Sequence, residues 1–504
     1  MISKLFSCSL QGVNSFPVAI EVSVSRGALP SYQVVGLPDL AVREGGARIQ
    51  TALKHIGHPL PPQKIVVNLA PADRKKDGSF LDLPIALAIL MAQGLLPKEC
   101  FENSMIMGEL GLDGQVKNFD GGLHAAIVAH QHGFKTCFLP PETAKDSAAM
   151  DEIKTYPVDH LSQIISFARQ EEPLTLSTPH PIPTKSFEHC MSDVVGQSFA
   201  KFAIEVAVTG GHNIILSGPP GVGKSMLAKR IPGLLPKLQR HEALELTEIH
   251  SAAGRQTKGL LSQRPFRSPH HSITTPALVG GGSPPKPGEI SLAHHGVLFL
   301  DELPEFQRHT LESLRQPLEN KSVHIARSLG NIDVPASFLL VAAANPCPCG
   351  YLKSHIKECV CSPRQLCKYQ TRLSGPLLDR IDIQTFVTQT SFLEMQANTK
   401  REDTSEDVRG RIADTFNYQC NRTGQKSPTP NAHLSPSETK SFCVLDATAT
   451  SCLHTLCEKN PTLSTRGVHK IIKIARTISD MQKDEHITKQ SLLLASKLRH
   501  TQQV

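Results

Sequence analysis

Apolar residues in the first third of the chain follow two different spacings. Strand-like runs bounded by turn residues cover Val18–Val24, Ile65–Leu69 and Thr136–Leu139. Helical spacing of apolar residues marks three other segments, Ala41–His55, Asp82–Gln93 and Gly122–His132. Strands and helices in this mixture predict an α+β unit. The apolar stretch from Leu83 to Leu96 is interrupted by Gln93 and Gly94, and it is shorter than the ~18 residues of a membrane span, so we expect a buried helix.

Short apolar strands also alternate with helices in the second half. They are Asn213–Ser217, Val297–Leu300 and Phe338–Ala343, and a helix is expected at Ser225–Ile231. Apolar strands alternating with helices are typical of a parallel sheet. Val323–Pro335 reads as a hairpin with its turn near Gly330.

Composition then sets the domain boundaries. A chain of 504 residues is too long for one core. Arg169–Phe187 contains four prolines with Ser and Thr and predicts a linker. From about Ser391 the pattern is helical, most clearly in Gly467–Gln482 and Thr488–Leu498. The predicted organisation is an α+β domain at 1–168, a linker at 169–187, an α/β domain at 188–390 and an all-α domain at 391–504.

Charge and cysteine content limit the class of protein. The net charge of +7 permits nucleic acid as a partner without demanding it, and the absence of Trp gives no obvious surface for stacking bases. The N-terminus shows neither a long apolar core nor a cleavage site for a signal peptide. We therefore expect a cytoplasmic protein without a membrane partner, in which 13 cysteines do not form a disulfide framework.

The strongest chemical motif is GPPGVGKS, between the first strand and the first helix of the α/β domain. It fits the phosphate-binding loop pattern in the required strand-loop-helix context. Glycines let backbone N–H groups wrap phosphates, the lysine contacts the β and γ oxygens of ATP, and the serine hydroxyl binds Mg²⁺. The predicted nucleotide-binding residues are Gly218, Pro219, Pro220, Gly221, Val222, Gly223, Lys224 and Ser225.

Carboxylates and an amide follow the next two apolar strands. In GVLFLDE, Asp301 and Glu302 come at the carboxyl end of a buried strand, where ligands of parallel sheets gather. We expect Asp301 to hold Mg²⁺ and Glu302 to polarise the attacking water. Asn345, after the following strand, is expected to position that water; the alternative is a simple turn before Pro346.

Five cysteines gather between the third strand and the segment SGPLLDRID. Cys347 and Cys349 form one C-x-C pair, and Cys359 and Cys361 form another. Two thiolate pairs across a short loop suit a structural zinc ion, with Cys367 as a spare or alternative ligand. The alternative is a loop with free thiols.

Loops rich in Gly, Pro, Arg and His offer contacts to DNA. The segment 255–295 is not expected to be core. Its basic side chains could contact phosphates, and the alternative is that these are ordinary solvated loops. The candidates are Arg264, Arg267 and Lys286, with Arg327 on the hairpin. His270 and His271 are expected to pack near the nucleotide or in the loop rather than to bind metal.

Together these motifs resemble the AAA+ ATPases, and specifically the magnesium-chelatase-like YifB/ComM family. The resemblance spans the chain through DVVGQ, RPFRSPHH, GEISLAHHGVLFLDELPEF, LRQPLE, NPCPCG and SGPLLDRID. It implies an AAA+ domain followed by a helical lid, with Arg380 as an arginine finger acting on a neighbouring subunit and Arg466 as the lid's sensor-2 arginine. Taken alone, each arginine would be expected in a surface ion pair. A finger acting in trans implies a homo-oligomeric ring, usually a hexamer. The resemblance further implies a DNA helicase that drives branch migration while transforming DNA is integrated.

The N-terminal domain resembles the Lon protease domain without its catalytic dyad. In KKDGSFLDLPIALAI, Phe80 stands where the serine nucleophile is expected, and Ala126 stands at the place of the lysine. Ser79 and Lys117 are out of register with those positions. A hydroxyl without its base is not a nucleophile, so the resemblance implies a binding or assembly module.

Four functions compete on the sequence. The first is an ATP-driven DNA motor. The second is a chelatase motor, for which the partner subunits are lacking in the chain. The third is an unfoldase or chaperone that uses the Lon-like domain as an adaptor. The fourth is a non-catalytic scaffold, which the set of Glu302, Asn345 and Arg380 disfavours.

Overall fold

Two compact units make up the computed structural model. It describes residues 2–10, 15–25, 30–76, 78–97, 99–179, 188–255, 259–282, 285–327, 330–352, 357–389, 402–460 and 463–499. Unit 1 comprises Met1–Thr184, Arg240–Ser262 and Pro284–Lys286, and unit 2 comprises Lys185–Gln239, Gln263–Ser283 and Pro287–Val504. Among the described residues, no helix is both long and apolar enough to cross a membrane.

Unit 1 is built on a mixed seven-stranded sheet with the order β3-β4-β2-β1-β5-β8-β9. The strands are β1 (Ile2–Ser9), β2 (Phe16–Ser25), β3 (Ser31–Val35), β4 (Lys64–Ala70), β5 (Ser104–Ile106), β8 (Thr136–Leu139) and β9 (Lys154–Pro157). All three predicted strands are present. β2 is antiparallel to β1 and β4, whereas the remaining pairs are parallel. Every second residue of β2 is buried, which is the alternation that one covered sheet face produces.

Five helices along the first part of the chain cover this sheet. They are α1 (Leu40–His55), α2 (Asp82–Ala92), α3 (Gly122–Gln131), α4 (Pro141–Ser147) and α5 (Leu161–Ala168). The predicted buried helix is α2, whose 11 residues are all buried. It packs against β1, β2 and α1, so its uniformly apolar sequence is explained by burial on all sides.

One helix from the middle of the chain also belongs to unit 1. It is α8 (Arg240–Ala252), which packs on α3. Arg240 forms ion pairs with Asp151 and Glu152, and Leu244 lies against the apolar cluster around α3. Burial raises the pKa of Glu248 on this helix to about 7 and lowers that of its neighbour His124 to about 4. Unit 1 is therefore built from three separate segments of the chain, of which the one carrying α8 is the second.

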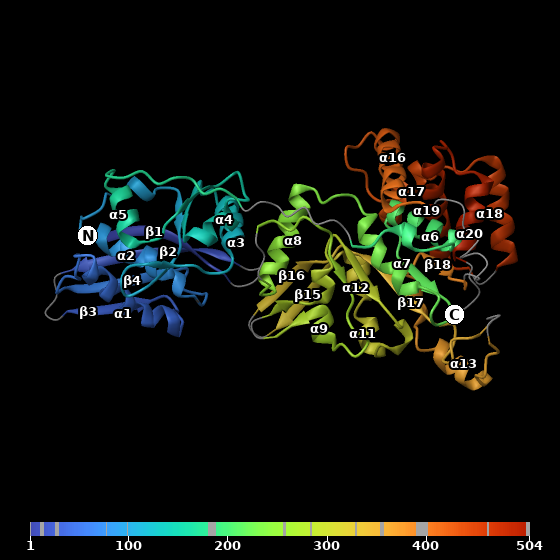
Figure 1. Cartoon of the computed structure of the whole chain (residues 1–504), viewed down its shortest axis with the longest axis horizontal. Coiled ribbons are helices and arrows are strands. Elements are labelled where there is room, and N and C mark those ends of the chain that lie inside the picture. The colour runs from blue at the N-terminus through green and yellow to red at the C-terminus, as the bar shows by residue number, and fades with distance from the viewer. Residues whose placement is uncertain are drawn as a thin grey trace. The chain divides into compact units, whose positions relative to one another are not determined.

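Unit 2 contains an all-parallel five-stranded sheet with the order β11-β14-β17-β10-β18. The strands are β10 (Ile214–Ser217), β11 (Phe266–Arg267), β14 (Val297–Leu300), β17 (Leu339–Ala344) and β18 (Ile383–Phe386). The predicted α/β fold class with a parallel sheet is confirmed. β10 lies between β17 and β18, so the loop that follows it leaves from the interior of the sheet; Figure 1 labels these two neighbouring strands.

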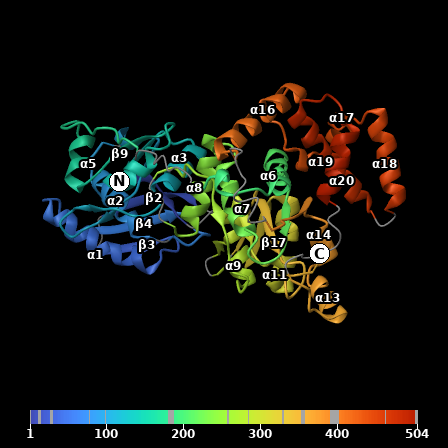
Figure 2. The same ribbon diagram turned by 45° about the vertical axis from the view of Figure 1, so that its right-hand side comes forward.

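The C-terminal helices share one apolar core with this sheet. They are α16 (Ser405–Thr423), α17 (Pro436–Phe442), α18 (Ala447–Lys459), α19 (Thr465–Gln482) and α20 (Lys489–Arg499). Figure 2 shows α6 (Ser198–Gly210) beside this helical group, and α6 packs against both α16 and α19. Ile412, Ile474 and Leu492 belong to the same core as Ile214 and Val341 of the sheet.

The hairpin prediction is confirmed, and the prediction that 255–295 lies outside the core is wrong in part. β15 (Ser322–Arg327) pairs antiparallel with β16 (Gly330–Pro335). In α10 (Glu289–Leu292), however, Ile290 and Leu292 are buried, and the helix packs against β11 and β15. Because α10 has only four residues and the segment around it is rich in Gly and Pro, the composition of the segment did not indicate a buried helix.

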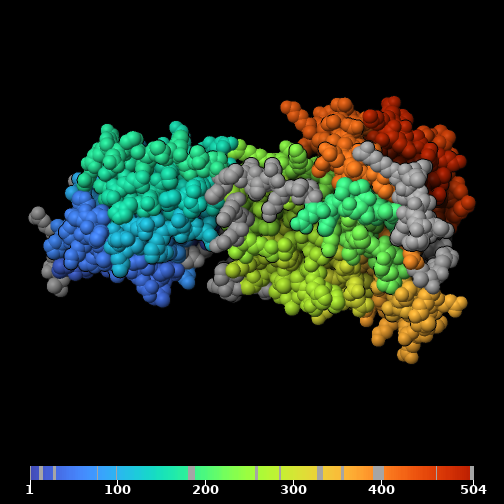
Figure 3. Space-filling model, in the orientation of Figure 1, coloured from blue at the N-terminus to red at the C-terminus, as the bar shows by residue number. Residues whose placement is uncertain are grey.

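In its described part, unit 2 contains six further short α-helices. They are α7 (Lys224–Arg230), α9 (Thr275–Val279), α11 (Arg308–Glu312), α12 (Arg315–Asn320), α13 (Pro363–Gln370) and α14 (Gly375–Leu378). Figure 3 shows the orange region of α13 as a lobe that stands out from the surface of this unit.

A buried histidine at the start of the sheet predicts acid sensitivity. His212 is fully buried, its Nε2 lies 2.8 Å from Thr477 Oγ1 on α19, and burial lowers its pKa from 6.5 to about 4. The unfolded chain therefore binds a proton at a pH where the folded protein does not. The free energy of unfolding should fall as pH drops from 6.5 to 4, by up to about 3 kcal/mol.

Urea unfolding at pH 7.5, 6.5 and 5.5 measures this effect. His212→Asn should make the dependence on pH weaker, although buried His124 still contributes to it, and His324→Asn at an exposed position is the control. Equal slopes for His212→Asn and the unmodified protein would refute the assignment.

Candidate nucleotide-binding site

Three neighbouring strands of unit 2 deliver the predicted site residues to one edge. Ser217 at the end of β10 pairs with Ala344 at the end of β17, and Leu300 of β14 pairs with Ala342. Gly218 N donates to Ala344 O at 3.2 Å, which joins the loop after β10 to the end of β17. The loop 218–225, Asn345 and the pair Asp301–Glu302 therefore meet at the carboxyl edge of the sheet, as expected from the sequence.

The loop after β10 has the backbone of a phosphate cradle. Gly221 and Gly223 have φ of 81° and 91°, a left-handed region that other residues adopt only with strain. A Cβ on either would meet open space, whereas a Cβ on Gly218 would lie 2.4 Å from Val387 O. Glycine is thus required at 221 and 223 by conformation and at 218 by close packing. The loop turns directly into α7, whose first N–H groups face the same opening.

Lys224 is folded over this loop. Its Nζ donates to Gly218 O at 2.7 Å, to Pro219 O at 2.8 Å and to Asn345 Oδ1 at 3.0 Å. Burial lowers the pKa of Lys224, and the charges of Asp301 and Glu302 oppose that shift. Phosphate oxygens accept stronger hydrogen bonds than the neutral oxygens that hold the ammonium here. The structure therefore brings Lys224 and Asn345 together beside the glycine loop.

Ser225 and Asp301 form a second contact at this edge. Ser225 Oγ donates to Asp301 Oδ2 at 2.8 Å, and Glu302 N donates to Asp301 Oδ1 at 3.0 Å. A hydroxyl and a carboxylate beside a phosphate cradle are the hard oxygen donors that Mg²⁺ takes. The residues present thus fit ATP with Mg²⁺, which would neutralise charge on the β- and γ-phosphates.

Glu302 has an unusual backbone and a histidine neighbour. Its φ is 51°, and its side chain remains 55% exposed. His271 Nδ1 lies 3.6 Å from Glu302 Oε2, and the rings of His270 and His271 are 4.0 Å apart. His271 therefore packs beside this carboxylate. The sequence predicts that the histidine pair packs near the nucleotide or in the loop. A direct partnership with Glu302 was not predicted, because 31 residues of sequence separate the two.

Arg380 and Arg466 are brought together by one carboxylate. Each donates to the same oxygen, Glu319 Oε1, at 2.7 Å. Arg380 also donates to Pro376 O at 2.7 Å, and its side chain is only 11% exposed. The hydrogen bond from Arg380, with Arg466 adding to it, lowers the pKa of Glu319. Neither guanidinium bonds to the P-loop of its own subunit in the described residues, and the role of Glu319 carried no signal in the sequence.

The segment around Arg380 is fixed by the C-terminal helices. Lys470 Nζ on α19 lies 2.7 Å from Asp382 Oδ1, and Arg499 on α20 donates to Asp382 O at 3.2 Å. Asp382 Oδ2 accepts from Asn213 N at 2.9 Å, just before β10. Burial favours the neutral acid, yet Lys470 and His212 keep the pKa of Asp382 below its usual value. The position of Arg380 is thus linked to both the sheet and the lid.

The candidate DNA contacts are mostly occupied within their own unit. Arg267 makes a two-bond ion pair with Glu289 at 2.6 and 2.7 Å. Arg264 donates to the carbonyl oxygens of Pro236 and His295. These contacts favour a structural role for both arginines. Lys286 is exposed, and the side chain of Arg327 lies outside the described residues.

Four of the five clustered cysteines come together. The Sγ atoms of Cys347, Cys349, Cys359 and Cys361 all lie within 4.8 Å of one another. Cys367 is exposed on α13 and is not a member of this group.

The Lon-like positions in unit 1 carry apolar side chains. Phe80 packs on the ring of Phe119 at 5.1 Å, and Ala126 is fully buried in α3. The hydroxyl of Ser79 bonds to Glu109, and Lys117 Nζ lies 4.0 Å from the other oxygen of that carboxylate. A carboxylate therefore separates this hydroxyl from the amine.

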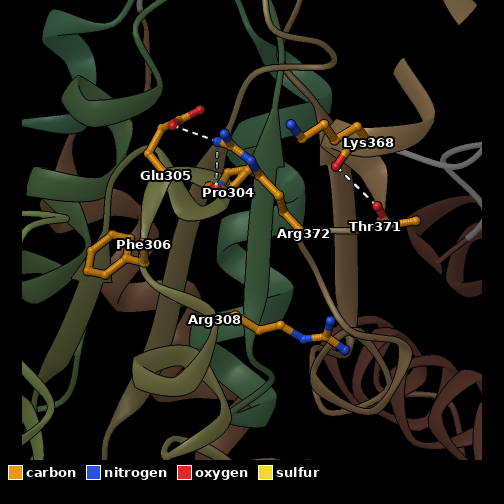
Figure 4. A pocket seen from close by; sticks show the side chains of 7 residues that line it. All are labelled: Pro304, Glu305, Phe306, Arg308, Lys368, Thr371 and Arg372. Atoms are coloured by element: carbon orange, nitrogen blue, oxygen red, sulfur yellow. Dashed lines mark hydrogen bonds and ion pairs between the residues drawn. The ribbon is translucent and has the colours of Figure 1, made fainter. Parts of the chain in front are cut away.

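A basic pocket of about 420 Å³ lies next to the site, on the segment that follows Glu302. Figure 4 shows Arg372 pointing at Glu305, with which it pairs at 2.6 Å. The pocket is lined by Pro304, Glu305, Phe306, Arg308, Lys368, Thr371 and Arg372. None of the predicted nucleotide-binding residues lines it.

A P-loop after the interior strand β10, an Asp-Glu pair after β14 in the same parallel sheet and a helical region packed on that sheet define an AAA+ protein. Three family models match the chain. Two describe the magnesium chelatase subunit ChlI and match residues 190–395 and 20–143. The third describes the C-terminal part of that subunit and matches residues 402–499. The chain belongs to the YifB/ComM family of magnesium-chelatase-like AAA+ proteins.

Individual relatives support the same assignment. The uncharacterized protein YifB of Escherichia coli K12 is 39% identical over 483 residues, covering 95% of this chain and 94% of YifB. The competence protein ComM of Haemophilus influenzae is 39% identical over 495 residues, covering 96% and 95%. A shorter likeness, 29% over 161 residues, links the chain to Lon protease 2 of Bacillus subtilis and covers 30% and 29% of the two chains.

Proposed function

We propose that this protein is an ATP-hydrolysing motor that acts on single-stranded or branched DNA as a ring, usually a hexamer. The observation that carries the proposal is the meeting of Lys224, Ser225–Asp301 and Asn345 on three adjacent strand ends. Glu302 stands at the same edge, with an exposed carboxylate that can polarise water.

Each side chain has a distinct task in this proposal. Lys224 binds phosphate oxygens, and Ser225 with Asp301 holds the metal ion. Glu302 accepts the proton of the attacking water, while Asn345 fixes the direction of attack. Transfer of the phosphoryl group also needs positively charged side chains beside the phosphates, to stabilise the negative charge of the transition state.

The arginines support a ring. In its own subunit Arg380 is held by Glu319 and Pro376, not by the P-loop. An arginine presented at a rigid site away from its own nucleotide is suited to act on the nucleotide of the next subunit, and a head-to-tail contact of that kind closes into a ring. Arg466 is proposed to approach the nucleotide from the lid once Glu319 releases it.

DNA as the load is supported by the likeness to a competence protein along almost the whole chain and by the family resemblance to branch-migration helicases. The alternative is a magnesium-chelatase-like or chaperone-like ATPase that remodels a protein partner, and the matches to the magnesium chelatase subunit ChlI keep that class in the comparison.

Stimulation of ATP hydrolysis distinguishes DNA from a protein partner as the substrate of the motor. We expect forked or single-stranded DNA to raise the rate several-fold, and an unfolded protein such as reduced casein to leave it unchanged. The measurement is steady-state phosphate release by the full chain at fixed salt, because contacts to phosphates weaken with ionic strength. Stimulation by unfolded protein and not by DNA would replace the DNA proposal with the alternative.

A further inference from the structure

The four clustered sulfur atoms have the spacing of a metal site rather than of disulfides. Cys347 Sγ lies 3.3 Å from Cys349 Sγ and 3.7 Å from Cys359 Sγ, and the last two are 3.5 Å apart. A disulfide needs about 2.05 Å. A tetrahedral zinc ion with Zn–S bonds of about 2.3 Å places its sulfur ligands about 3.8 Å apart. The three separations are slightly shorter than the edges of that tetrahedron and far longer than a disulfide bond, and the Sγ atom of Cys361 lies within 4.8 Å of the other three.

Backbone groups stabilise the first of these ligands. Leu352 N donates to Cys347 Sγ at 3.3 Å, and Gly350 N donates to Cys347 O at 2.9 Å. The turn is closed by Gly350, whose φ of 85° is in the left-handed region. The Leu352 N–H fixes the direction of the Cys347 sulfur, as outer-shell donors do for metal ligands. Cys347 itself is fully buried, so the turn holds a thiol away from solvent and points it at three others.

We infer that Cys347, Cys349, Cys359 and Cys361 bind one structural Zn²⁺ ion. Binding converts four thiols to four thiolates and releases four protons, so charge and atoms balance without an oxidant. Because the protein fills all four positions, no place remains for a catalytic water. Cys367 is not a ligand, since it lies outside the group of sulfur atoms.

The turn that carries the zinc ligands contacts two parts of the nucleotide site and stabilises them. Cys347 follows Asn345 by two residues, and Asn345 Oδ1 accepts from Lys224. On the same turn, a Cβ added to Gly350 would lie 2.6 Å from Pro220 Cδ of the P-loop. The metal-bound turn therefore presses on the loop and fixes the end of β17. This supporting role rests on the proposed ATPase function, whereas zinc binding does not.

Metal analysis tests zinc binding directly. Full-length protein from zinc-supplemented cells, purified without chelator, should contain about one zinc per chain. Cys367→Ser should retain it, and Cys349→Ser should lose it. If Cys349→Ser fails to fold, titration of the unmodified protein with a mercurial should release the zinc as four thiols react. Zinc below about 0.1 per chain, or iron in its place, would overturn the inference.

Gly350→Ala tests the contact with the P-loop. This variant should keep its zinc and bind a fluorescent ATP analogue about tenfold more weakly, because the new Cβ must displace Pro220 or strain the turn. Gly410→Ala, on α16 where a Cβ meets no atom within 4 Å, should change neither property. Unchanged ATP affinity in Gly350→Ala would refute the supporting role and leave the zinc content as a separate result.

Discussion

Replacing Glu302 by glutamine is expected to slow ATP hydrolysis about 10²–10⁴-fold and to leave ATP binding intact. The amide keeps the size of the side chain but cannot accept the proton of the attacking water. Lys224, Ser225 and Asp301 retain their own contacts, so the phosphates are still held. Phosphate release and titration with a fluorescent ATP analogue measure the two properties separately.

Glu305→Gln is the matched control for this change. Glu305 lies three residues further along and pairs with Arg372 at the surface, so its loss should cost little activity. Equal rates for Glu302→Gln and the unmodified protein would remove Glu302 from the proton-accepting role.

Arg380→Ala should reduce hydrolysis by about 10³-fold or more, because it removes positive charge from the transition state. Arg372→Ala, which breaks only an exposed ion pair, is its control. Loss of activity alone does not say which subunit Arg380 serves, since Arg380 also helps to hold Glu319.

Mixing two inactive variants answers that question. Lys224→Ala destroys the phosphate site but keeps Arg380, and Arg380→Ala does the reverse. In a mixed ring, roughly a quarter of the interfaces combine an intact site with an intact arginine from the neighbour. Hydrolysis should therefore reappear on mixing. A mixture as inactive as its components, with ring assembly shown by sedimentation, would mean that Arg380 acts within its own subunit.

Local sequence signals predicted the parts of the fold that depend on neighbouring residues. The P-loop, the buried strands β10, β14 and β17, the fully buried α2 and the β15–β16 hairpin all lie where apolar spacing and turn residues placed them. The meeting of Lys224, Asn345 and Asp301 at one edge followed from the parallel order of those strands. The cysteine group followed from the spacing of its two pairs.

Contacts between distant side chains away from the sheet edge were not predicted. Glu319 contacts Arg380 and Arg466, which lie 61 and 147 residues further along the chain. α8 packs with unit 1 through the apolar contact of Leu244 with the cluster around α3, and Arg240 adds ion pairs with acidic residues almost 90 residues earlier. Such ion pairs leave no periodic pattern in the sequence. The buried face of α10 was missed for a different reason, because four residues are too few to show helical spacing.

The most direct measurement of the central proposal is release of a labelled strand from forked DNA. The unmodified protein should displace the strand with ATP, and it should fail with a non-hydrolysable analogue. Glu302→Gln should bind the fork and release nothing, whereas Glu305→Gln should act like the unmodified protein. Active ATP hydrolysis that neither responds to the fork nor separates its strands would contradict the proposal that this protein is a DNA motor.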